Sequence, residues 1–192
     1  MKKLIVDVFY YPPEDYRGYK VVGVLIDDWN SNEASEIICI TSGDKDIKAY
    51  IPGKFKEREL PCITRLLKTL GNTELMSIDT IIVDGYVDLS NETIKIDTLG
   101  TALYDYLCRR GFGHISIIGI AKTKYHDETL MSNCIEVHRG KEAINPLYVS
   151  SIGLGIDNIK IGEKIKSMYG EHRLPAMIKL ADKETKLGAL GF

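Results

Sequence analysis

Thr80-Ile81-Ile82-Val83-Asp84-Gly85 is a short apolar run of the kind that forms a strand buried on both faces. Before it, leucine and isoleucine recur at helical spacing from Leu60 to Leu70, and Gly71 is predicted to end that helix. After it, we expect a second helix from about Thr98 to Arg110 and a second buried strand from Ile115 to Ala121. This helix–strand–helix–strand alternation predicts an α/β protein with right-handed crossovers within one sheet.

Three strands are predicted upstream of the first helix, at Leu4–Tyr11, Lys20–Asp27 and Glu36–Thr41. Their short polar connections favour an antiparallel meander. Three strands followed by helix, strand, helix and strand is the arrangement of the ribonuclease H-like α/β fold, a mixed sheet with helices on both faces. The remaining predicted elements are shorter strands at Cys134–His138 and Leu147–Ser151, a helix at Asn158–Tyr169, and a last helix that starts at Pro175.

The composition is that of an ordinary globular protein. The 192 residues are 44% hydrophobic and 27% charged, with 25 lysines and arginines against 27 acids and a net charge of −2. We expect a single domain over 1–192, because one domain typically takes roughly 100–200 residues. Ample apolar content excludes collagen-like, disordered and coiled-coil classes. The near-neutral balance argues against coating nucleic acid by bulk charge, but not against a local basic groove beside an acidic metal site.

Two further patterns bear on the compartment. No apolar run approaches the roughly 18 residues needed to span a bilayer, so no membrane association is predicted. The cysteines, Cys39, Cys62, Cys108 and Cys134, lie far apart and form no CxxC pair. We therefore expect reduced core thiols in a cytoplasmic protein.

Three carboxylates occupy positions that are unusual for exposed charges. Asp7 lies inside the first apolar strand, on the same face as Ile5, and Asp84 ends the buried strand 80–84. Glu59 precedes Ile63 by one helical turn and so lies on the inward stripe of its helix. In a ribonuclease H-like sheet the first and fourth strands are neighbours, so these acids would converge. Hard ions such as Mg²⁺ take carboxylates together with waters and phosphate oxygens, and two such ions can assist phosphodiester hydrolysis.

Each acid taken alone also has a purely structural interpretation. A strand aspartate can pair with a lysine or cap a turn, and a glutamate at a helix start can serve the helix dipole. Only the joint pattern favours a metal site over these alternatives.

A larger set of motifs resembles the endonuclease V family, in order and at similar spacing across nearly the whole chain. The matching segments are Val6-Asp7-Val8, Tyr50-Ile51-Pro52-Gly53, Phe55, Arg58-Glu59, Pro61, Val83-Asp84-Gly85, Gly119-Ile120-Ala121-Lys122, Arg139-Gly140, Pro146-Leu147-Tyr148-Val149-Ser150, Arg173-Leu174-Pro175 and Leu180-Ala181-Asp182. The resemblance implies a ribonuclease H-like fold and a Mg²⁺-dependent endonuclease (Mn²⁺ being the alternative ion) that recognises deaminated bases, chiefly inosine, in DNA repair.

The resemblance also implies roles for individual residues. Asp7, Glu59, Asp84 and Asp182 would be the metal carboxylates, and Lys122 would approach the scissile phosphate; together they form the implied catalytic set. The nucleic-acid-binding residues would be Tyr50, Ile51 and Pro52, as a wedge that separates the strands, with Gly53 and Gly85 admitting the flipped nucleotide. An aromatic and two stiff apolar side chains can fill the space that a displaced base leaves.

The chain departs from the family pattern at the segments that read the base. Tyr86-Val87-Asp88-Leu89-Ser90-Asn91-Glu92-Thr93 replaces the family's segment after Asp-Gly, Ser151-Ile152-Gly153-Leu154-Gly155 replaces a Gly-His, and Ala49 replaces a proline. Three hypotheses therefore stand: a nuclease for inosine-type sites, the same chemistry on another nucleic-acid substrate, and a non-catalytic nucleic-acid-binding descendant. We expect a cytoplasmic monomer whose partner is nucleic acid, DNA being favoured over RNA.

Overall fold

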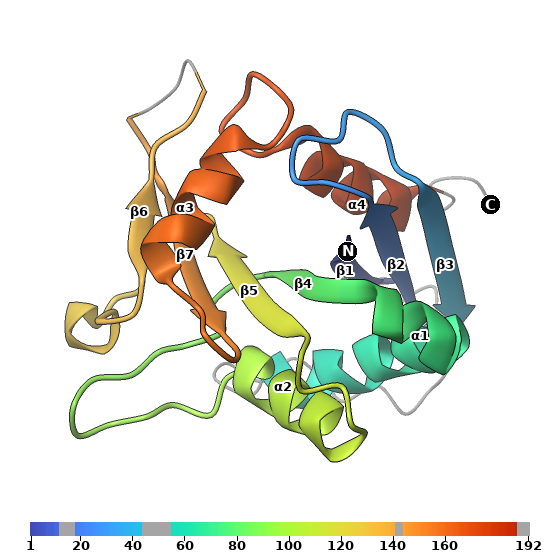
Figure 1. Cartoon of the computed structure of the whole chain (residues 1–192), viewed down its shortest axis with the longest axis horizontal. Helices are drawn as coiled ribbons and strands as arrows, with labels where there is room; N and C mark the ends of the chain where they lie inside the picture. The colour runs from blue at the N-terminus through green and yellow to red at the C-terminus, as the bar shows by residue number, and fades with distance from the viewer. Residues whose placement is uncertain (12–17, 44–54, 141–143, 188–192) are drawn as a thin grey trace.

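The computed structural model describes residues 1–11, 18–43, 55–140 and 144–187. Its strands are β1 (Lys2–Tyr10), β2 (Tyr19–Ile26), β3 (Glu36–Ser42), β4 (Ile78–Asp84), β5 (Ser116–Ala121), β6 (Ile135–Val137) and β7 (Leu147–Ile152). Its helices are α1 (Phe55–Ser77), α2 (Leu99–Arg109), α3 (Asn158–Ser167) and α4 (Ala176–Lys186), with a 3-10 turn, η2 (Glu128–Leu130). The strands form one seven-stranded sheet in the order β3-β2-β1-β4-β5-β7-β6 (Figure 1).

The centre of this sheet is parallel and its two sides are antiparallel. β1 pairs in parallel with β4, and β4 pairs in parallel with β5. The predicted meander of β1, β2 and β3 is confirmed, and β5, β7 and β6 continue with antiparallel pairing on the other side. Because β1, β4 and β5 run in the same direction, their carboxyl ends meet at one edge of the sheet.

Successive residues of the central strands face two different hydrophobic cores. Leu4 and Val6 of β1 belong to the core covered by α1 and α2, whereas Ile5 belongs to the core covered by α3 and α4. The strands are therefore buried on both faces, which explains why their sequences are almost continuously apolar. The predicted mixed sheet with helices on both faces is confirmed (Figure 1).

The end of α1 differs from the prediction. At Gly71 the backbone leaves the helix with φ 74° and ψ 169°, as a helix end would require, but helical structure resumes and continues to Ser77. The continuation has a packing reason, because Leu75 is fully buried in the core covered by α1 and α2, hereafter the first core. Gly71 is thus a kink that glycine tolerates, because it lacks a Cβ.

One buried arginine fixes the connection that leads from α3 into α4. Arg139, 6% exposed, donates hydrogen bonds to the backbone carbonyls of Met168 (2.6 Å), Gly170 (3.0 Å), His172 (2.6 Å) and Arg173 (3.2 Å). These carbonyls belong to an irregular segment and would otherwise lack partners, which is costly in a buried setting. Arg139 therefore holds the path of the segment that leads into α4.

The structure also bears on the thiols and on the membrane prediction. All four cysteines are free, but only Cys62 is buried; Cys39 and Cys108 are exposed and Cys134 is partly exposed. The prediction of core thiols was wrong for these three, because cysteines without a pattern carry no burial signal. Within the described ranges, no helix is long and apolar enough to cross a membrane.

Candidate active site

Two of the predicted acids lie side by side at the carboxyl edge of the parallel strands. The register pairs Val6 of β1 with Val83 of β4, so Asp7 and Asp84 are the next residues along the two strands. Asp7 is half-buried and, like Ile5, lies on the face covered by α4. Asp84 ends its strand and is exposed. The prediction that the first and fourth strands are adjacent in the sheet is confirmed.

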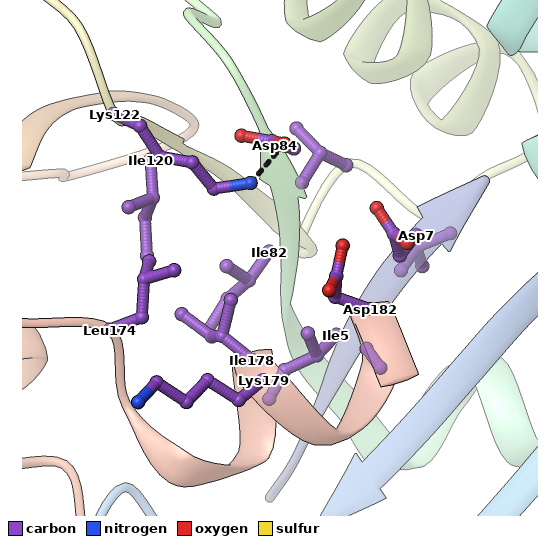
Figure 2. A pocket seen from close by; sticks show the side chains of 13 residues that line it. Ile5, Asp7, Ile82, Asp84, Ile120, Lys122, Leu174, Ile178, Lys179 and Asp182 are labelled. Carbon is purple, nitrogen blue, oxygen red and sulfur yellow. Dashed lines mark hydrogen bonds and ion pairs between the residues drawn. The ribbon is translucent and has the colours of Figure 1, made fainter. Parts of the chain in front are cut away.

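Lys122 joins these acids from the neighbouring strand. It follows the last residue of β5, and its Nζ lies 2.8 Å from Oδ2 of Asp84 (Figure 2). Burial lowers the pKa of Lys122, but the hydrogen bond and charge of Asp84, with the charges of Asp182 and Asp7, outweigh it and raise the pKa overall. Lys122 is therefore a permanent positive charge at the edge of the sheet that carries Asp7 and Asp84, hereafter the acid edge.

Helix α4 carries the fourth predicted acid and a residue that the sequence did not single out. Thr185 is fully buried, and its Oγ1 lies 2.8 Å from Oδ2 of Asp7 and 2.8 Å from the backbone carbonyl of Asp182. The Asp182 carboxylate lies beside Asp7 and Asp84 (Figure 2) and accepts hydrogen bonds from Nζ of Lys186 at 2.7 and 2.8 Å. Burial raises the pKa of Asp7, and the charges of Asp182 and Asp84 add to this effect against the hydrogen bond of Thr185.

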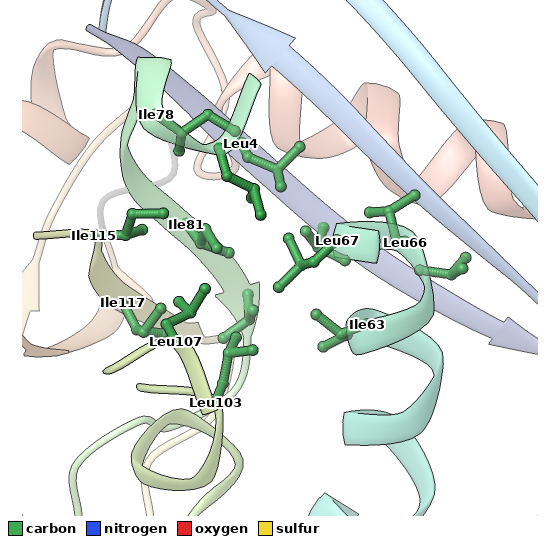
Figure 3. Close-up of a cluster of buried hydrophobic side chains, with 14 of the residues drawn as sticks. Leu4, Ile63, Leu66, Leu67, Ile78, Ile81, Leu103, Leu107, Ile115 and Ile117 are labelled. Carbon is green, nitrogen blue, oxygen red and sulfur yellow. The ribbon is translucent and has the colours of Figure 1, made fainter. Parts of the chain in front are cut away.

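Glu59 reaches the acid edge from the opposite face of the sheet. Helix α1 is held by Ile63, Leu66 and Leu67, which point into the first core (Figure 3). One turn earlier on the same stripe, Glu59 is 9% exposed and has no hydrogen bond or ion pair to another described residue. Burial raises its pKa well above the ordinary value, and the charges of Asp7 and Asp84 raise it further, whereas Arg58 lowers it.

Two pockets meet at Asp7 and Asp84, which line both. One, of about 270 Å³, opens toward α1 and is also lined by Glu59, Arg58 and Tyr10. The guanidinium of Arg58 lies over the Tyr10 ring, 3.5 Å from its centroid. The pocket therefore contains one fixed positive charge beside three carboxylates.

The second pocket, of about 70 Å³, lies on the α4 side of the same acids. Its wall is apolar, formed by Ile5, Val6, Ile82, Val83, Ile120, Leu174, Ile178 and Ala181, and its charged groups are Asp7, Asp84, Lys122, Lys179 and Asp182. In Figure 2 the Lys179 side chain extends away from the acids. This apolar wall accounts for part of the desolvation that raises the pKa of Asp7.

The donor set fits a hard divalent cation. Carboxylate oxygens are the ligands that Mg²⁺ takes, and Glu59 is a buried carboxylate, without a hydrogen-bonding partner among the described residues, that lines the pocket with Asp7 and Asp84. Across the described part of the chain, no three acidic, histidine or cysteine side chains are close enough together to form a complete metal cluster. Mg²⁺ does not require one, because it commonly binds one or two carboxylates and retains several waters.

Gly85 adopts a backbone conformation that favours glycine. Its φ is 92°, and its N–H donates to the carbonyl of Ile120 at 3.1 Å, which ties the end of β4 to β5. A Cβ on Gly119 would lie 2.4 Å from the Gly85 carbonyl oxygen, so the backbones approach closely here. The other predicted nucleic-acid-binding residues, Tyr50, Ile51, Pro52 and Gly53, lie outside the described residues.

Sequence reasoning missed two polar residues of this edge. Thr185 and Lys186 follow Asp182 at the third and fourth positions, and this helical spacing is the signal that could have identified them. The place of Arg58 over Tyr10 likewise requires the folded structure.

Neither a family model nor a curated protein matches this sequence. Solved structures do match. The crystal structure of the endonuclease V from Bacillus subtilis is similar with a TM-score of 0.67 and 22% identity, over 97% of this chain and 79% of that one. Human ENDOV is similar with a TM-score of 0.65 and 15% identity, over 98% of this chain and 84% of that one. Argonaute from Marinitoga piezophila, in complex with a guide RNA and target DNA, has a TM-score of 0.51 and 10% identity, over 98% of this chain and 30% of that one.

These likenesses establish the fold. The chain has the ribonuclease H-like architecture predicted from the order of its elements, and it is structurally similar to endonuclease V structures over nearly its whole length.

Proposed function

We propose that this chain is a divergent endonuclease V-like nuclease that hydrolyses a phosphodiester of nucleic acid with the help of Mg²⁺. The observation that supports the proposal is that Asp7 and Asp84 line two pockets at one edge of a ribonuclease H-like sheet, with Lys122 bonded to Asp84, Glu59 in one pocket and Asp182 in the other. The substrate we propose is DNA with a deaminated base of the inosine type, and the cellular role DNA repair in the cytoplasm.

The four acids are the proposed metal ligands, and they differ in burial. Asp7 and Asp84, which line both pockets, would hold the metal, with Glu59 joining them from one face of the sheet and Asp182 from the other. When bound, Mg²⁺ supplies Lewis-acid polarisation of the phosphate and a lowered pKa of the attacking water. Glu59 is the most buried of the four, so it gains most from a nearby cation in place of an isolated buried charge.

Lys122 supplies a positive charge for the scissile phosphate. Its ammonium contacts Asp84 and would bind an oxygen of the substrate phosphate. In the reaction, water adds to phosphorus and one phosphorus–oxygen bond breaks; the resemblance implies 3′-hydroxyl and 5′-phosphate ends, at the second phosphodiester 3′ to the lesion. Tyr50-Ile51-Pro52, with Gly53 and Gly85, would keep the target base out of its stack.

The test is cleavage of labelled single strands and duplexes, with and without a single inosine, in Mg²⁺ or EDTA. We expect Mg²⁺-dependent cleavage by the wild type and a loss of at least about 100-fold in Asp84→Asn, because a metal carboxylate becomes a neutral amide. Asp105→Asn, a change of the same chemistry at an exposed position of α2, is the matched control and should retain activity.

The result also separates the alternatives. Equal cleavage of inosine-containing and plain strands would leave the nuclease chemistry and replace the lesion specificity by another substrate. Binding of nucleic acid without Mg²⁺-dependent cleavage of any strand would refute the nuclease and favour the non-catalytic descendant. The ion pairs of Lys122 with Asp84 and of Lys186 with Asp182 are the observation that favours this second candidate.

A further inference from the structure

An aromatic cluster adjoins the acid edge and takes no part in the chemistry proposed above. It consists of Tyr86, Tyr125 and His126, hereafter the aromatic platform. The rings of Tyr86 and Tyr125 meet edge to face with centroids 5.7 Å apart, and those of Tyr125 and His126 lie 4.3 Å apart at an interplanar angle of 41°. These three side chains form one continuous group.

The platform is attached directly to the two strands that carry the acid site. Tyr86 comes two residues after Asp84, and Tyr125 comes three residues after Lys122. The Tyr86 hydroxyl donates to the backbone carbonyl of Thr123 at 2.7 Å, which ties the two segments together. Because Asp84 and Lys122 are themselves in contact, the platform lies beside the place proposed for the scissile phosphate.

The packing of the protein does not account for the platform. Neither tyrosine belongs to the two hydrophobic cores or to the side chains packed against them. Tyr86 and Tyr125 are partly exposed and His126 is exposed. Aromatic rings that are only partly buried keep part of their area available to a ligand.

The neighbouring charges indicate the class of ligand. In the segment Lys122-Thr123-Lys124-Tyr125-His126, two lysines come before the two aromatic rings. Nζ of Lys124 lies 2.8 Å from Oε1 of Glu128, but the lysine side chain is still 43% exposed. Aromatic rings that accept bases, beside lysines that accept phosphates, are how proteins bind single-stranded nucleic acid. Paired bases in a duplex hide their faces in the stack and would not reach such a surface.

We propose that the aromatic platform stacks an unpaired nucleobase of a single strand whose phosphate approaches Lys122. The proposal rests on the nuclease function proposed above and specifies its substrate as unpaired nucleic acid. Tyr86 is the first residue of the segment 86–93, which departs from the endonuclease V pattern. The platform would therefore bind a base by stacking at the place where that family's base-reading residues have been replaced. DNA and RNA strands offer the same base faces, and both enter the test.

The experiment measures binding of fluorescein-labelled 12-nucleotide DNA and RNA strands to the full chain by anisotropy, in EDTA and at one fixed salt concentration. EDTA prevents Mg²⁺-dependent cleavage, so the readout is independent of catalysis. We expect single strands to bind more tightly than the matching duplex, and Tyr125→Ala to weaken single-strand binding about tenfold. Tyr125→Phe keeps the ring and should bind like the wild type. Tyr169→Ala, which removes an exposed tyrosine elsewhere, should have no effect.

A second measurement needs no substitution. Strands of the same length with abasic sites keep every phosphate but lose the bases, and the wild type should bind them about as weakly as Tyr125→Ala binds the normal strand. Equal affinity of the wild type for normal, abasic and duplex nucleic acid, or of Tyr125→Ala and wild type for single strands, would overturn the platform. A protein that binds through Tyr125 but cleaves nothing would retain the platform and refute the nuclease.

Discussion

Glu59 is a carboxylate whose surroundings disfavour its charge. It is 9% exposed, it faces Asp7 and Asp84, and Arg58 is the cation that offsets it in part. An isolated buried carboxylate destabilises a fold unless it is protonated or paired. A protein that keeps one beside two further acids gives up stability at a place where a cation would recover it.

The pH dependence of stability tests whether the buried Glu59 carboxylate destabilises the fold. Burial raises the pKa of Glu59, so the folded protein still holds a proton where the unfolded chain has lost it. Stability therefore falls as the pH rises from the ordinary carboxyl range, about 4, through the raised pKa. In EDTA, Glu59→Gln should reduce this fall and increase the melting temperature at neutral pH by at least about 2 °C.

Thermal melts between pH 4 and about pH 8 measure the effect. Some slope should remain in Glu59→Gln, because the pKa of Asp7 is raised as well. Glu163→Gln, on the exposed side of α3, is the control and should melt like the wild type. A variant Glu59→Gln that is less stable than the wild type at neutral pH would show that the carboxylate is satisfied.

At the scale of elements, the site depends on how α4 docks against the sheet. Nζ of Lys20 on β2 donates to the carbonyls of Glu184 (2.5 Å) and Leu187 (2.9 Å), which caps the carboxyl end of the helix. Arg139 fixes the segment before the helix, and Thr185 joins the last turn of the helix to Asp7. Contacts from β2, from the segment after β6 and from β1 thus hold this helix, and Asp182 with it.

The Thr185 hydroxyl is the contact that can be removed with least change of shape. Thr185→Val is nearly isosteric but leaves Oδ2 of Asp7 without its donor. We expect a loss of about 1–3 kcal/mol in the free energy of unfolding, measured in urea, because the bond is to a charged group. Apparent Mg²⁺ affinity or cleavage should fall by about 10-fold or more, as for other residues that orient a ligand.

Thr185→Ser is the matched control, because it retains the hydroxyl and loses only a methyl group. If valine and serine variants bind Mg²⁺ equally well, the hydroxyl has no role in orienting Asp7.

The elements could be predicted because they are local. Periodicity located the helices and strands to within a few residues, and their order predicted the sheet. The continuation of α1 beyond Gly71 was missed because a glycine kink and a glycine helix end have the same local sequence, and only the burial of Leu75 separates them. The short turn η2 carried no periodic signal at all.

Two acids of the candidate site could be identified from the residues because a carboxylate inside an apolar run is conspicuous, whereas Asp182 was indicated only by the family resemblance. Asp7 and Asp84 stand out in this way. Thr185 does not, because a threonine on a helix is common and its partner lies in the first strand. The contacts of Lys20 and Arg139 with α4 likewise require the three-dimensional arrangement, since each joins segments far apart in the sequence.

For the whole molecule, the prediction is that Mg²⁺ stabilises the fold. At a concentration about 100 times its dissociation constant, a ligand of the native state adds about 2.7 kcal/mol. For a protein of this size that corresponds to an increase of roughly 5–10 °C in the melting temperature. The comparison is between MgCl₂ and EDTA, with KCl added to equal ionic strength.

The stabilisation should disappear in the double variant Asp7→Asn with Asp84→Asn, since it removes the two acids that line both pockets. An identical increase in KCl alone, or in the double variant, would assign the effect to general screening of the negative charges.

The contact between Thr185 and Asp7 joins residues that are 178 positions apart. A chain under synthesis folds its amino-terminal segments first, so the meander and α1 can form while α4 has not yet been made. Asp7, Glu59 and Asp84 are then present, but Asp182 and the hydroxyl that orients Asp7 are not. A nascent chain would therefore carry an incomplete candidate site. It could bind the proposed metal fully only after α4 has been translated.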